Sequence, residues 1–132
     1  MASAILFNIP STGHVNPSLP LVRELVNRGE DILYVNTEDY RASIEKTGCR
    51  FARYPELHEL EYLIKQSAGA GNLPRNMRDL LRITAQLTPY ARELIQREQP
   101  DYVIYDSLTR WAHLAVRQAG LPSISLNTTF IV

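Results

Sequence analysis

The chain is poor in several features that would each point to a particular class of protein. It has one cysteine in 132 residues, Cys49, so it cannot form an internal disulfide, which favours a reducing compartment. Its 14 basic residues balance 14 acidic ones with no Lys/Arg block, which disfavours nucleic acid as a partner. No apolar run approaches the roughly 20 residues of a membrane span, and no signal-peptide pattern begins the chain. We therefore expect a soluble, cytoplasmic protein without a membrane partner.

The familiar nucleotide and metal motifs are also missing. The turn Ser11-Thr12-Gly13 lacks the further glycines of the dinucleotide fingerprint, and no Gly-Lys-Ser/Thr follows a glycine loop. His58 and His113 do not pair with a Cys/His/Asp cluster at metal-ligand spacing. We expect neither a metal site nor a bound cofactor, and no NAD or ATP site of the familiar kinds.

What the chain does contain is an alternation of strand and helix signals. Its length and its 45% apolar content suit one domain with a substantial core. The patterns predict strands at 4–9, 31–36, 50–54, 100–106 and 123–127. They predict helices from Asn16 (N-cap) and Pro17 to Gly29, at 37–46, from about 75 to 98 with a kink or break at Pro89, and at 111–119. This order predicts an α/β fold with a doubly wound, mostly parallel, Rossmann-like sheet.

A histidine stands at the junction of the first strand and the first helix. Ligands of open α/β sheets bind at the carboxyl ends of strands, so His14 occupies a position typical of functional residues. The nearby helix N-terminus favours neutral imidazole, which can act as a general base. A lone histidine is more often structural, and position alone does not decide between the two interpretations.

An aspartate ends the buried strand that is predicted at residues 100–106. Asp106 would reach the same sheet edge as His14 and could orient its imidazole. Capping of the next helix by Asp106 or Ser107 explains the residue equally well. The residues alone leave both roles open.

The segment Phe7-Asn8-Ile9-Pro10-Ser11-Thr12-Gly13-His14-Val15-Asn16-Pro17 resembles the start of GT-B glycosyltransferases of the UDP-glycosyltransferase superfamily. The bacterial macrolide-glycosyltransferase branch is the most similar. Further resemblance lies at 28–35, 47–51, 100–106 and 112–125, so it covers nearly the whole chain. The resemblance implies the N-terminal, acceptor-binding half of a GT-B fold.

The resemblance also implies roles for particular residues. His14 would deprotonate the acceptor hydroxyl and Asp106 would orient it, with inversion at the anomeric carbon of a UDP-sugar and no metal. Thr12 and Gly13 would face the donor diphosphate. The acceptor, a macrolide, flavonoid or other phenol, would lie in a pocket lined by Leu57, Leu60, Ile64, Leu80, Ile83, Leu87, Asn127 and Thr128.

In the family, most of the donor site lies in a second, C-terminal domain, which residues 1–132 do not include. We therefore expect UDP-sugar binding only together with such a domain, and little or no transferase activity from the isolated chain. Surface that this domain would cover could favour self-association.

Three alternatives remain on the sequence alone. The chain could be a non-catalytic module that binds a small molecule, or one subunit of a split glycosyltransferase. A flavodoxin-like regulator is disfavoured because Pro10-Ser11-Thr12 stands where a phosphoacceptor site would need an acid. The identity of the acceptor and of the sugar is not encoded in any motif.

Overall fold

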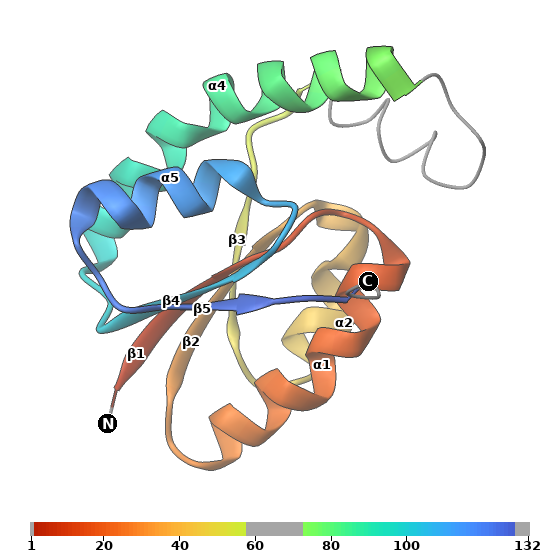
Figure 1. Ribbon diagram of the computed structural model, residues 1–132. Helices are drawn as coiled ribbons and strands as arrows, with labels where there is room; N and C mark the ends of the chain where they lie inside the picture. Colours follow the sequence, from red (N-terminus) through yellow and green to blue (C-terminus); the bar gives the residue numbers. More distant parts are fainter. Residues whose placement is uncertain (1, 58–72, 129–132) are drawn as a thin grey trace.

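The computed structural model describes residues 2–57 and 73–128. Within them the strands form one parallel sheet of order β3-β2-β1-β4-β5 (Figure 1). The strands are β1 (Ser3–Phe7), β2 (Asp31–Asn36), β3 (Arg50–Arg53), β4 (Tyr102–Asp106) and β5 (Ser123–Leu126). The predicted doubly wound α/β fold is confirmed, and each strand lies where its apolar pattern placed it, to within a few residues.

Helices cover both faces of the sheet (Figure 1). One face carries α1 (Thr12–Asn27) and α2 (Arg41–Glu45), which follows the short 3₁₀ helix η1 (Glu38–Tyr40). The other face carries the long α4 (Leu73–Glu98) and α5 (Arg110–Ala119). None of the helices in the described part of the chain combines the length and the apolar character of a membrane span.

The alternation of side chains in β1 explains this two-layer covering. Ile5 and Phe7 belong to the core cluster that includes Leu87 and Trp111 of α4 and α5. The intervening Leu6 belongs to the second cluster, with residues of α1. All three β1 side chains are essentially fully buried, because both faces of a parallel sheet lie under helices.

The strand order reverses between β1 and β4. From β1 the chain proceeds outward to β2 and β3, then crosses back to β4 on the other side of β1. Phe7 is in register with Tyr105, so the segments that follow β1 and β4 leave the same edge side by side. Such a switch point is where ligands bind in open α/β sheets.

The start of α1 corrects the sequence prediction. The helix begins at Thr12, with Ser11 as N-cap, and not at Pro17, so Pro17 and Pro20 lie inside it. The backbone N–H groups of His14 and Val15 donate to the carbonyl of Ser11 and close a first turn ahead of the prolines. His14 is therefore the third residue of the helix and not part of the preceding loop.

Pro89 does not divide α4, which runs without a break to Glu98. Proline inside a helix costs about 3 kcal/mol. Leu87 before it and Ala91 and Leu94 after it are all buried in the same core cluster. Burial on both sides of the proline stabilises one continuous helix.

Candidate active site

The imidazole of His14 and the carboxylate of Asp106 meet at the switch point. His14 Nδ1 lies 2.8 Å from Asp106 Oδ2, although the residues are 92 positions apart in the sequence. The carboxylate has no exposed surface, whereas 14% of the His14 side chain is exposed. The pair thus has a buried, fixed member and a member that solutes can reach.

The turn after β4 holds the carboxylate in place. Asp106 Oδ1 accepts a hydrogen bond of 2.9 Å from the backbone N–H of Leu108. The hydroxyl of Thr109 donates to the Asp106 carbonyl, which fixes the backbone of the same residue. Asp106 therefore stabilises its own turn and faces His14. Neither Asp106 nor Ser107 caps α5, because the N-cap is Thr109 and no side chain forms a cap hydrogen bond there, so the capping alternative is wrong.

A buried asparagine holds the first turn of α1, which carries His14. The Asn8 side-chain amide donates to the His14 carbonyl at 3.0 Å and to the Tyr34 hydroxyl at 2.9 Å. Its side-chain oxygen accepts from the backbone N–H of Ile9. Asn8 is only 1% exposed. The position of His14 thus depends on a polar group that has lost its contact with water.

This network continues to Tyr34 of β2 and to Tyr54, which follows β3. Ser18 Oγ lies 2.7 Å from the Tyr34 hydroxyl and donates to the carbonyl of Val15. Burial raises the pKa of Tyr34 to about 12, although the hydrogen bonds with Ser18 and Asn8 lower it in part. The Tyr54 hydroxyl donates to the Asn8 carbonyl at 2.9 Å. The loop after β1 is consequently anchored on both faces of the sheet.

Comparisons with known proteins find similar bacterial glycosyltransferases. The chain is 29% identical over 132 residues to the uncharacterized UDP-glucosyltransferase YojK of Bacillus subtilis (strain 168), covering 98% of the chain and 32% of the relative. It is 29% identical over 130 residues to the oleandomycin glycosyltransferase of Streptomyces antibioticus, covering 98% of the chain and 30% of the relative. The crystal structure of the glycotransferase of kitacinnamycin superposes with a TM-score of 0.83 at 27% identity, covering 98% of the chain and 31% of that protein.

The chain is homologous to bacterial UDP- and NDP-glycosyltransferases, macrolide glycosyltransferases among them, and it has the fold of one domain of GT-B glycosyltransferases. It spans about a third of the length of the curated relatives it matches. That share and the five-stranded sheet fit the N-terminal domain of such a glycosyltransferase. No family model matches the chain.

The residues predicted to face the donor lie at the start of α1. Thr12 and Gly13 are its first two residues and both are exposed. The Thr12 hydroxyl lies 3.3 Å from that of Tyr40. A Cβ added to Gly13 would meet no heavy atom within 4 Å, so the surface in front of this turn is open.

The residues predicted to line the acceptor pocket divide into three groups. Ile83 and Leu87 have no exposed surface and pack in the core, so the structure gives them a packing role and not a place at a pocket surface. Leu57 and Leu80 are half-buried at the margin of the same core cluster. Leu60 and Ile64 lie outside the described residues.

The last two predicted residues follow β5. Asn127 is exposed and has no contact with His14 among the hydrogen bonds of the described chain. Thr128 is half-buried, and its Oγ1 lies 2.6 Å from His14 Nδ1. Thr128 is thus brought to the site, but to the side of the imidazole that faces Asp106.

From the sequence alone we did not identify Asn8 and Tyr34, which support the loop after β1 and the first turn of α1. The available signal was polarity in buried positions: Asn8 directly follows a fully apolar strand end, and Tyr34 stands within the apolar run of β2. Because such side chains need partners when buried, each predicts a hydrogen bond. Neither pattern identifies the partner.

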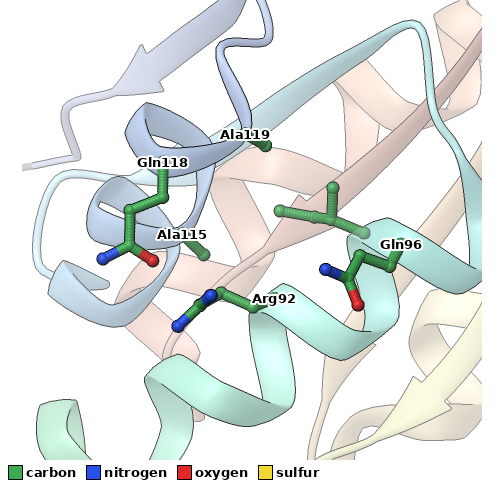
Figure 2. A pocket seen from close by; sticks show the side chains of 6 residues that line it. Arg92, Gln96, Ala115, Gln118 and Ala119 are labelled. Atoms are coloured by element: carbon green, nitrogen blue, oxygen red, sulfur yellow. The ribbon is translucent and has the colours of Figure 1, made fainter.

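A surface cavity of about 80 Å³ lies away from this site, between α4 and α5. Figure 2 shows Arg92 and Gln96 of α4 facing Gln118 of α5 across it. Both helices end at the amino edge of the sheet, opposite His14. Among the described residues, no three or more His, Cys, Asp or Glu side chains are grouped as metal ligands would be.

Proposed function

We propose that this chain is the acceptor-binding part of a glycosyltransferase that transfers a sugar from a UDP-sugar to a hydroxyl of a small apolar or aromatic acceptor. His14 is the general base and Asp106 orients it. The observation that carries the proposal is the 2.8 Å contact between His14 Nδ1 and Asp106 Oδ2 at the switch point of the sheet. Homology to glycosyltransferases supports the reaction class.

The geometry supports one direction of proton transfer. A carboxylate only accepts hydrogen bonds, so with Asp106 ionised the His14 proton lies on Nδ1 and the Nε2 lone pair remains free. Nε2 takes the proton of the acceptor hydroxyl. The acceptor oxygen attacks the anomeric carbon, the bond to the nucleotide diphosphate breaks, and the configuration inverts. The buried carboxylate stabilises the imidazolium that forms.

The start of α1 is the place we propose for the leaving diphosphate. The first N–H groups of a helix have no partner within it and attract anions. Thr12 and Gly13 provide such groups, and both residues are exposed near His14. Most contacts with the nucleotide would come from a further, donor-binding domain.

Binding is tested by NMR titration of the ¹⁵N-labelled chain with macrolides, phenols and flavonoids and, separately, with UDP-glucose. We expect acceptors to shift signals around His14, Asp106 and Leu80, and UDP-glucose to cause little change. Strong binding of UDP-glucose alone would contradict the division of labour that we propose. No response to any acceptor would contradict the acceptor site.

Catalysis is tested after fusing the chain to the part of a relative that it does not cover. His14→Ala is expected to lower kcat by about 10²–10⁴-fold, the usual contribution of a general base. His113→Ala is the matched control, because its Nδ1 contacts the Tyr105 hydroxyl and not this site. Equal turnover by the two variants would favour a module that binds without catalysing.

A further inference from the structure

A threonine hydroxyl lies against the imidazole on the same side as the carboxylate. Thr128 Oγ1 is 2.6 Å from His14 Nδ1 and 3.3 Å from Asp106 Oδ2. Thr128 lies two residues beyond the end of β5 and is 114 positions from His14 in the sequence. Three segments that are far apart in the chain therefore converge on one ring nitrogen.

The protons in this triangle can be assigned from chemistry. Two lone pairs 2.8 Å apart would repel each other, so Nδ1 carries a proton that faces Asp106 Oδ2. Thr128 Oγ1 then acts as a second acceptor for this proton. Its own hydroxyl proton goes to the remaining acceptor, Asp106 Oδ2. Because these hydrogen bonds hold Nδ1 toward Asp106 and Thr128, the Nε2 lone pair points away from the triangle.

We propose that Thr128 is a positioning residue of the His14–Asp106 site, whose hydroxyl shields the Nδ1 proton and restricts rotation of the ring. The catalytic meaning of this role rests on the proposed function, but the hydrogen bonds do not. Threonine suits the role because its branched Cβ restricts χ1 and so the direction of the hydroxyl. This assignment replaces the acceptor-pocket role expected from the sequence.

The test observes the ring itself in the free, ¹⁵N-labelled chain, without any substrate. NMR measures the tautomer of His14 and the rate at which its Nδ1 proton exchanges with water. Thr128→Val replaces the hydroxyl with a methyl of similar size. Because a hydrogen bond contributes about 0.5–1.5 kcal/mol, we expect exchange to become about 2–12-fold faster. Thr128→Ser restores the hydroxyl and should stay within about twofold of the unmodified chain.

Two further variants make the result decisive. Thr88→Val is the matched control, since the half-buried Thr88 hydroxyl donates within α4, to Thr84. Thr128→Ala carries the same expectation as the valine variant and serves if valine does not fit. Unchanged exchange in both Thr128 variants that lack the hydroxyl, or a serine variant that behaves like valine, would overturn the proposal.

The fused enzyme gives a second readout. Thr128→Val is expected to lower kcat several-fold and leave KM for the acceptor within about twofold, because ring orientation and not acceptor contact is lost. A change confined to KM would instead return Thr128 to the acceptor pocket and overturn the positioning role. Absence of acceptor binding would refute the proposed function and leave the exchange measurement intact, so the two failures are distinguishable.

Discussion

The two edges of the parallel sheet use polar side chains in opposite ways. At the carboxyl edge, Asn8, Tyr34 and Asp106 are almost fully buried and hydrogen-bonded to partners from distant segments. At the amino edge, Arg50 forms ion pairs with Asp31 and Glu98, and half of the Arg50 side chain is exposed. One edge is built from buried hydrogen bonds and the other from solvated charges.

The two kinds of interaction differ in how strongly they constrain the positions of the side chains. Exposed ion pairs contribute little because water competes for both charges. A buried polar group that loses its partner costs about 1–3 kcal/mol, so a buried network allows one arrangement and penalises the others. The edge that carries His14 is therefore the edge where geometry is constrained most strongly.

The largest expected effect is on kcat, and it is measured by making the same aspartate-to-asparagine substitution at each of the two edges. Asp106→Asn places an amide where the carboxylate accepts from His14 Nδ1, which favours the wrong tautomer. We expect kcat of the fused enzyme to fall by at least about 100-fold. Asp101→Asn, at the amino edge, affects only contacts with Ser3 and should leave kcat within about twofold. Similar losses for the two variants would remove the functional distinction between the edges.

The next effect concerns stability at the carboxyl edge. Asn8→Ala removes the bonds to His14, Tyr34 and Ile9 and leaves buried groups without partners. We expect the free energy of unfolding in urea to fall by about 3 kcal/mol. Asn27→Ala is the control, because Asn27 is exposed at the end of α1 and should change stability by less than about 0.5 kcal/mol. A loss below about 1 kcal/mol for Asn8→Ala would show that the network tolerates rearrangement.

The same network predicts a loss of stability at alkaline pH. Burial raises the pKa of Tyr34 to about 12, above the value of 10.0 expected in the unfolded chain. The Tyr34 contribution is thus fully present below about pH 10 and is lost as the pH rises toward 12, because the unfolded chain ionises first. Between pH 8 and pH 11 we expect the free energy of unfolding to fall by about 1 kcal/mol more in the unmodified chain than in Tyr34→Phe. Equal losses would show that this hydroxyl ionises alike in both states.

Sequence alone predicted the order of the elements because apolar periodicity is local. The continuous apolar run of β1, which is buried on both faces, and the glycine-terminated end of α5, where Gly120 has φ of 68°, are each encoded within a few residues. The convergence of His14 and Asp106 was also predictable, since the carboxyl ends of parallel strands share an edge. Their catalytic roles stay predictions.

Other features depended on partners that no local pattern names. The earlier start of α1 depends on the first turn closed on Ser11 and on the Asn8 bond to the His14 carbonyl, both of which outweigh the preference of proline for a helix start. The contact of Thr128 with His14 spans 114 positions. The packing of Leu87 in the core, and not in a pocket, depends on how α4 crosses the sheet. The contact of Thr128 and the packing of Leu87 are tertiary, whereas the start of α1 depends on nearby hydrogen bonds that apolar periodicity does not encode.

The smallest expected effect is at the amino edge and tests the other half of the comparison. Arg50→Ala removes the contacts of 2.9 Å with Asp31 and 3.2 Å with Glu98, and both partners keep contact with water. We expect a loss of about 0.2–1 kcal/mol in the free energy of unfolding, which becomes smaller still when the salt concentration rises. Urea unfolding at low and high salt measures both quantities. A loss above about 2 kcal/mol that salt does not reduce would mean that these charges act as a buried network does, and the contrast between the two edges would then be one of composition and not of energetics.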